Sequence, residues 1–112
     1  MNNLRAIQNS IIATYLLRDS FCDLNNIPKL NKLNPKDFIG SFYKKIVEKI
    51  NHAISTDDAL GVLSFEIQDK CEGTRYEDDF LEILASNPLP FKTLPKHTEV
   101  LTMKRIEREI MR

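Results

Sequence analysis

The residues in this sequence with the most evident capacity for chemistry are four neighbouring acids, Glu77, Asp78, Asp79 and Glu82. Carboxylates at close range could hold a magnesium ion or act as a general acid and base. Adjacent residues point to different sides of a helix, however, and acids in a first helical turn are already favoured by the positive end of the helix dipole. We therefore expect these acids to begin a helix rather than to form a catalytic site.

The cysteines and histidines are too scattered to predict a metal or redox site. Cys22 and Cys71 are the only cysteines and form no Cys-x-x-Cys pair, and His52 and His97 are equally isolated. A zinc site needs three or four ligands that converge on one point. We therefore expect no metal and no cofactor, and we expect both cysteines to lie in or near the core as small apolar side chains.

The sequence also lacks the glycine-rich phosphate-binding loops and the His-Glu-x-x-His motif of nucleotide and zinc-hydrolase chemistry, so an enzyme is not expected. Nucleic-acid binding has limited support, because the net charge is zero and no arginine-rich helix with interleaved aromatic residues is present. Weak, salt-sensitive phosphate contacts could come from two basic groups, which are Lys29, Lys32 and Lys36 and, nearer the C-terminus, Lys104, Arg105 and Arg108.

The length and composition of the chain indicate a single globular domain. The 112 residues are 42% hydrophobic and 29% charged, which suits one core without disulfide or metal support. The sequence contains no apolar run of 18 residues and no secretory signal pattern. We therefore expect one domain over residues 1–112, located in the cytoplasm.

A helix entry followed by an amphipathic run is the clearest element of the sequence. Asn34 can cap a helix, Pro35 suits a first helical position, and Gly40 allows a bend before a longer helix. Residues 2–18 predict an earlier helix, whereas residues 21–33 predict a short helical turn and then a loop. The apolar stripe of the longer helix consists of Tyr43, Ile46, Val47, Ile50 and Ile54, and that of the earlier helix of Leu4, Ile7, Ile11, Ile12, Tyr15 and Leu16.

Three further helices are expected in the second half of the chain. Residues 55–58 supply a cap and first-turn acids for a helix that runs to about Lys70, with Leu60, Leu63 and Ile67 on one face. A second helix covers residues 75–86. A proline-rich break then separates it from a last helix that starts near Pro95. No strand pattern of useful length is present, so the sequence predicts an all-α fold.

The last two helices are expected to form a C-terminal helical hairpin, at about residues 75–112, that projects from a small head of about four helices at about residues 1–74. Such a hairpin can bury only part of its apolar stripe against itself, and the remainder invites a second copy of the chain. Alternatively, the hairpin folds back on the head and buries the stripe within one chain. The stripe of the last helix consists of Val100, Met103, Ile106 and Ile110.

Charges of the two signs are unevenly distributed along the chain. The net charge is +4 over residues 1–54, −7 over residues 55–90 and +3 over residues 91–112. Such segregation could steer one copy onto another, or onto a charged partner protein. Solvated faces that only keep the protein soluble are the alternative interpretation.

The order of these motifs resembles the N-terminal domain of the bacterial replicative DNA helicase, the DnaB family. An apolar-x-Pro-x-Asp-Phe stretch is matched by residues 33–38, and an aromatic helix entry by residues 42–46. A leucine-containing helix with an acid-marked start is matched by residues 57–63, and a helix that ends in Asn-Pro by residues 80–88. The closing helix carries a Lys-Arg pair among apolar residues, here at residues 103–106.

The sequence also departs from the family pattern in three places. Ile39 stands where the family usually has tyrosine, the connection from Phe38 to Phe42 is shorter, and Leu94-Pro95-Lys96-His97 replaces the usual entry to the last helix. The family's motor domain, with its P-loop, is not found in these 112 residues. The resemblance extends from about Arg5 to Arg112.

The resemblance implies a non-catalytic role in DNA replication. Domains of this family pair through their helical hairpins into a collar on the hexameric motor, and they dock primase or a helicase loader in the primosome. For Phe80 and Leu84, burial in the core of one chain is the preferred alternative to a place in such an interface. Residue by residue, the resemblance implies a protein interface made of Phe80, Leu84, Val100, Met103, Lys104, Arg105, Ile106, Arg108 and Ile110.

Two other functions are consistent with the sequence. A stand-alone helical adaptor, such as a helicase loader or regulator, would use the same hairpin surface on a different partner protein. A nucleic-acid-binding module would instead show an affinity that falls steeply with salt.

Overall fold

The computed structural model describes residues 3–20 and 25–111, and within these residues the chain is all-α, as predicted. Five α-helices and two short 3-10 turns follow one another, and no strand occurs in this part of the chain. The elements are α1 (Asn3–Leu16), η1 (Arg18–Ser20), η2 (Pro35–Asp37), α2 (Ser41–Thr56), α3 (Leu60–Cys71), α4 (Glu77–Leu84) and α5 (Leu94–Ile110).

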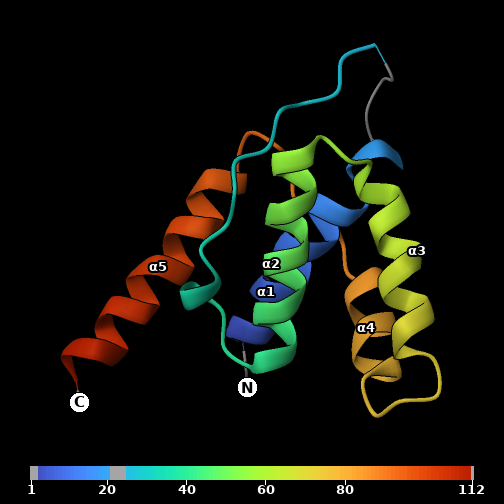
Figure 1. Cartoon of the computed structure of the whole chain (residues 1–112). Helices are drawn as coiled ribbons and strands as arrows, with labels where there is room; N and C mark the ends of the chain where they lie inside the picture. Colours follow the sequence, from blue (N-terminus) through green and yellow to red (C-terminus); the bar gives the residue numbers. More distant parts are fainter. Residues whose placement is uncertain (1–2, 21–24, 112) are drawn as a thin grey trace.

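Helix α1 lies at the centre of the fold and contacts the other four α-helices. Figure 1 shows α5 on one side of α1 and α2, with α3 and α4 on the other side. Because α1 has neighbours on several sides, Ile11, Ile12, Tyr15 and Leu16 are all buried. The broad apolar stripe that the sequence predicts for this helix is therefore confirmed.

The predicted entry to α2 is confirmed in its details. The Asn34 side chain accepts a hydrogen bond from the Lys36 N–H at 3.0 Å, and Pro35 is the first residue of η2. Gly40 then has a φ of +105°, a backbone conformation that favours glycine, and the chain turns there into α2. The buried face of α2 consists of Tyr43, Ile46, Val47, Ile50 and Ala53.

An extended segment, residues 25–34, lies between the two 3-10 turns. The Asn51 side chain on α2 holds it in place, because it accepts from the Leu33 N–H at 2.8 Å and donates to the Leu33 carbonyl at 2.7 Å. The Tyr15 hydroxyl donates to the Asn31 carbonyl at 2.6 Å. The helical turn predicted near Phe21 lies outside the described residues at 21–24, as does Cys22.

The turn between α2 and α3 differs from the prediction. Residues 55–58 were expected to cap the next helix, but they close α2 instead: Asp57 has a φ of +58°, and the Asp58 N–H donates to the Ala53 carbonyl at 2.9 Å. Helix α3 begins only at Leu60. Asp57 and Asp58, which were expected in the first turn of α3, therefore lie in the turn that ends α2.

The two C-terminal helices are consecutive, as predicted, but they do not pack on one another as a hairpin. No Cα atom of α4 lies within 8 Å of a Cα atom of α5, both helices being fully described. The link between them contains Pro88 and Pro90, and its Leu89 N–H donates to the Thr14 hydroxyl of α1 at 2.8 Å. This link carries the chain past α1, so that α5 packs on the opposite side (Figure 1).

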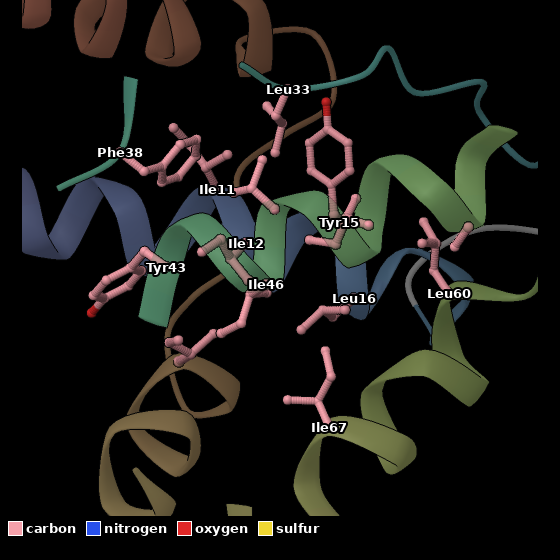
Figure 2. Packing of buried hydrophobic residues seen from close by; sticks show 14 of the residues in the cluster. Ile11, Ile12, Tyr15, Leu16, Leu33, Phe38, Tyr43, Ile46, Leu60 and Ile67 are labelled. Atoms are coloured by element: carbon pink, nitrogen blue, oxygen red, sulfur yellow. The ribbon is translucent and has the colours of Figure 1, made fainter. Parts of the chain in front are cut away.

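All five helices contribute to one hydrophobic core, part of which is shown in Figure 2. Phe38 from the η2 region and Leu33 from the extended segment close one side of it. Cys71 is buried, as expected for a small apolar side chain. From the last two helices the core receives Phe80, Ile83, Leu94 and Leu101.

Candidate interaction surface

The most prominent unpartnered feature of the structure is the outer face of α5. Val100, Met103, Ile106 and Ile110 are all exposed there, and Ile110 is 75% exposed. We call these four residues the α5 stripe. The helix does fold back onto the rest of the chain, but it packs through Leu94 and Leu101 instead. The stripe predicted from the sequence is therefore neither buried against a hairpin partner nor buried against the head.

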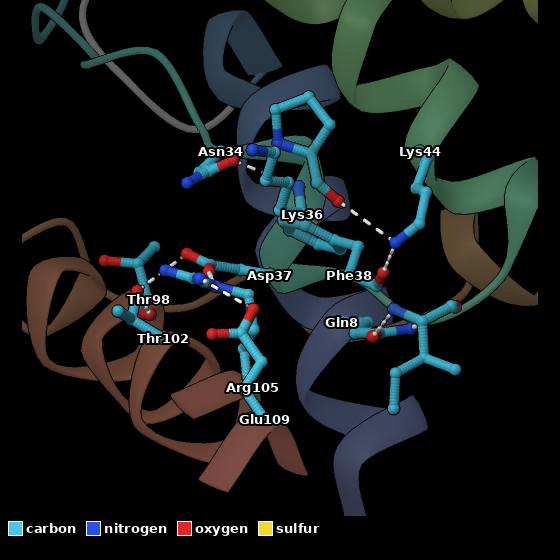
Figure 3. A network of polar contacts seen from close by, with 12 residues as sticks. Gln8, Asn34, Lys36, Asp37, Phe38, Lys44, Thr98, Thr102, Arg105 and Glu109 are labelled. Carbon is cyan, nitrogen blue, oxygen red and sulfur yellow. Dashed lines mark hydrogen bonds and ion pairs between the residues drawn. The ribbon is translucent and has the colours of Figure 1, made fainter. Parts of the chain in front are cut away.

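A polar cluster holds the inner face of α5 against η2 (Figure 3). Asp37 is buried, and its carboxylate accepts from Arg105 Nε at 2.6 Å and from the Thr102 hydroxyl at 2.6 Å. Arg105 also donates to Glu109, one turn further along α5, at 3.1 Å. The hydrogen bond to Asp37 is the main cause of the raised pKa of Arg105, so this side chain stays charged. The cluster fixes which face of α5 points outward.

The Asp37 carboxylate is itself held in place by contacts around η2. The Lys44 ammonium donates to the Phe38 carbonyl and, at 3.4 Å, to the Pro35 carbonyl. The Gln8 side chain on α1 pairs with both backbone groups of Ile39, accepting at 2.7 Å and donating at 3.3 Å. Figure 3 shows these contacts on either side of the chain between η2 and α2. Helices α1, α2 and α5 are thus joined through one short stretch of backbone.

The structure divides the predicted interface residues into two groups. Phe80 is 1% exposed and lies in the core, and Leu84 packs against the same core, so neither belongs to an outer surface. The Lys104 ammonium lies 3.5 Å from the Glu107 carboxylate, and the Arg108 side chain is exposed. Arg105 is turned toward Asp37, and Arg108 lines a hollow with Arg105 and Glu109 on the side of α5 that faces η2. The predicted residues on the outer side of α5 are therefore Val100, Met103, Lys104, Ile106 and Ile110.

Three of the acids on α4 make contacts with α1 or with the turn that precedes α4. Arg5 on α1 donates to Asp79 at 3.1 Å and to Glu82 at 2.7 Å. The Glu77 carboxylate accepts from the Gly73 N–H at 2.7 Å. Among the described residues, no group of three or more histidine, cysteine or acidic side chains is placed to hold a metal ion. Glu77, Asp78 and Asp79 lie in the first turn of α4, in agreement with the prediction that the acids begin a helix.

A second exposed apolar surface was missed by the sequence analysis. Phe65 on α3 is 72% exposed, and Val62 on the same helix and Leu81 on α4 are also exposed. The acids that follow them in sequence are Glu66 and Asp69 on α3 and Glu72 directly after it, all exposed. The available signal was the spacing of Val62 and Phe65, which sets them off the buried line of Leu60 and Ile67. We call Val62, Phe65, Glu66, Asp69, Glu72 and Leu81 the acidic face.

No family model, curated protein or solved structure matches this chain. In the described ranges, no helix is both long enough and apolar enough to cross a membrane.

Proposed function

We propose that this chain is a non-catalytic protein-interaction domain of the replicative helicase type, in which the α5 stripe pairs subunits and helps to dock primase or a helicase loader. The specific family rests on the order of sequence motifs from Arg5 to Arg112. Its place of action would be the cytoplasm, where bacterial replication occurs. The proposal differs from the sequence-based version in one respect, because pairing would use α5 alone rather than a hairpin of α4 and α5.

The observation that carries this proposal is the orientation of α5. Four apolar side chains face outward although the same helix has an inner face that packs on the core. Hydrogen bonds from Thr102 and Arg105 to Asp37 hold this orientation. The stripe is therefore exposed on a helix that is fixed to the rest of the fold. Exposed apolar side chains that recur along one helix face, here with Glu99 and Glu107 among them, are typical of a site that another protein covers.

The proposal is tested by replacing a central residue of the α5 stripe. Ile106→Glu places a charge in the surface that pairing would bury, and it should weaken self-association at least about tenfold. Sedimentation velocity over a concentration series measures this directly. Ile106 is exposed, so the variant should keep its helix content and thermal unfolding temperature.

Ile27→Glu provides a matched control. Ile27 is 42% exposed and Ile106 is 43% exposed, so the two variants make the same chemical change at the same degree of exposure. Ile27 lies in the extended segment rather than on α5. The control should sediment as the wild-type chain does. Equal sedimentation of the wild type, Ile106→Glu and Ile27→Glu would remove the α5 stripe as a pairing surface.

Docking of primase is a separate part of the proposal and needs its own measurement. Calorimetric titration of the purified helicase-binding domain of primase into the chain should give saturable binding that Ile106→Glu or Met103→Glu reduces. Binding to a helicase or loader, with none to primase, would instead favour the stand-alone adaptor. The mass of the endogenous polypeptide also separates the two candidates: the helicase domain predicts a band several times heavier than 13.0 kDa, and the adaptor a band near that mass.

A further inference from the structure

A hollow of about 470 Å³ lies between the extended segment and the first half of α5. Figure 1 shows these two parts of the chain next to one another. Residues 28–34 line the hollow from one side and residues 91–102 from the other, and no residue of the α5 stripe takes part in its lining. Sites for small molecules typically have volumes of about 300–1,000 Å³. The hollow is therefore large enough for a small organic molecule, and it is separate from the α5 stripe.

The floor of the hollow and part of its walls are apolar. Tyr15, Phe38 and Leu101 belong to the hydrophobic core and form the floor. Pro28 and Phe91 line the hollow from opposite sides, and both are only partly buried, so they keep apolar surface that a ligand can cover. An aromatic ring or a short alkyl chain therefore suits this part of the hollow.

The extended segment supplies hydrogen-bond donors that have no partner. Lys29, Asn31 and Lys32 line the hollow and are exposed, and their side chains make no hydrogen bond or ion pair within the described chain. The Asn34 side chain accepts from the Lys36 N–H, which leaves its own amide N–H groups available (Figure 3). Two ammonium groups and two amides are therefore free to donate to a ligand.

The polar groups on the α5 side of the hollow are already engaged. The Thr98 hydroxyl donates to the Pro95 carbonyl at 2.9 Å, and the Thr102 hydroxyl donates to the Asp37 carboxylate at 2.6 Å. Among the described residues, Asp37 is the only acid that lines the hollow, and it is paired with Arg105. The unpaired charges in the lining are therefore the two positive charges of the extended segment.

The charges next to the lining residues in sequence do not reverse this sign. Glu99 follows Thr98 on α5, is exposed, and does not line the hollow itself. Three exposed lysines, Lys36, Lys92 and Lys96, also adjoin lining residues in the sequence. With Lys29 and Lys32 in the lining, the surroundings of the hollow are positive, and they favour an anionic ligand.

We propose that this hollow binds a small organic anion with an apolar body. Its carboxylate or phosphate group meets Lys29 and Lys32, and its ring or chain covers Pro28 and Phe91. An ionised carboxylate or phosphate offers only acceptors, which match the free donors of the extended segment. The inference goes beyond the proposed function and does not depend on self-association, because the hollow and the α5 stripe share no residue.

Three related molecules test the binding of such an anion. 3-Phenylpropionate carries a ring and a carboxylate, 3-phenyl-1-propanol has the same ring without the charge, and propionate has the charge without the ring. Titrated into the ¹⁵N-labelled chain, 3-phenylpropionate should shift amide resonances of residues 29–34 and 94–102 together, and the shifts should saturate by about 10 mM. It should bind at least about fivefold more tightly than either other molecule. Phenyl phosphate, titrated in parallel, shows which head group the hollow prefers.

Replacing the two lysines tests where the anionic group binds. Lys29→Gln/Lys32→Gln should weaken the binding of 3-phenylpropionate at least about fivefold. Lys45→Gln/Lys49→Gln is the matched control, because these lysines are exposed on α2 beside the acidic face and do not line the hollow. The control should bind within about twofold of the wild type. All four replaced side chains are exposed, so circular dichroism should show unchanged helix content in both variants.

Three results would overturn the inference. Shifts that do not saturate, or that spread over the surface outside residues 29–34 and 94–102, mean that the hollow is not a binding site for these anions. Equal binding of 3-phenylpropionate and 3-phenyl-1-propanol means that the hollow does not recognise the negative charge. Unchanged binding by Lys29→Gln/Lys32→Gln means that the extended segment does not hold the anionic group. None of these results bears on pairing through the α5 stripe, which sedimentation tests separately.

Discussion

At the scale of single residues, burial changes the acid–base chemistry of Tyr15 on α1. Its ring lies in the core, and its hydroxyl donates to the Asn31 carbonyl of the extended segment at 2.6 Å. Burial raises the pKa of Tyr15 to about 12, because the phenolate would lose its hydration. Loss of the Tyr15 proton therefore also removes the hydrogen bond that attaches residues 25–34 to α1.

The raised pKa of Tyr15 predicts a specific loss of stability in alkali. The pKa is higher in the folded state than the usual value of 10.0, so the folded state holds this proton more tightly than the unfolded state. The associated stability is complete below about pH 10 and is lost as the pH rises toward 12, by at most about 2–3 kcal/mol. Urea unfolding between pH 9 and 12 should show this loss, and Tyr15→Phe should reduce it. A Tyr15→Phe variant with the same alkaline slope would contradict the prediction.

Single residues also show how far local sequence patterns can predict a fold. Asn34, Pro35 and Gly40 were assigned their roles correctly, because a cap and a turn depend on neighbours within a few residues. The roles of Asn51 and Gln8 could not be predicted in the same way. Asn51 bonds to a residue 18 positions away and Gln8 to one 31 positions away, and nothing in the spacing of an amide side chain identifies so distant a partner.

At the scale of elements, the sequence predicts that α5 exists but not which of its faces is buried. Val100, Met103, Ile106 and Ile110 make the longer apolar stripe, so periodicity favours them as the inner face. The inner face is instead built from Leu94, Leu101 and polar residues that bond to Asp37. Asp37, which is 65 positions from Thr102 in the sequence, decides the orientation of α5. Only the tertiary structure brings these two residues together.

The link between α4 and α5 provides a prediction at this scale. Thr14→Val keeps the shape of the side chain but removes the hydroxyl that accepts from the Leu89 N–H at 2.8 Å. The unpaired N–H should lower the free energy of unfolding by about 1–3 kcal/mol, as measured by urea titration. Thr14→Ser retains the hydroxyl and is the matched control. A Val variant as stable as the wild type would mean that this hydrogen bond does not hold the link on α1.

At the scale of the whole molecule, the separation of charge is visible in the sequence, but its meaning depends on the fold. The segment of −7 net charge forms α3, α4 and their turns, and the segment of +3 forms α5 with its approach. Had α4 and α5 packed as a hairpin, the two signs would have lain side by side and largely cancelled. Because α5 crosses to the far side of α1, the opposite charges lie far enough apart to act on different neighbours.

This separation predicts how self-association responds to salt. Between 0.1 M and 1 M sodium chloride the screening length falls from about 10 Å to about 3 Å, so attraction between the negative segment of one copy and the positive segment of another should largely disappear. Sedimentation should therefore show association that weakens several-fold over this range. Arg108→Gln removes one exposed positive charge from α5 and should make the dependence on salt shallower. If association strengthens with salt in both the wild type and Arg108→Gln, the contact is apolar alone. Its charges then neither steer nor stabilise it.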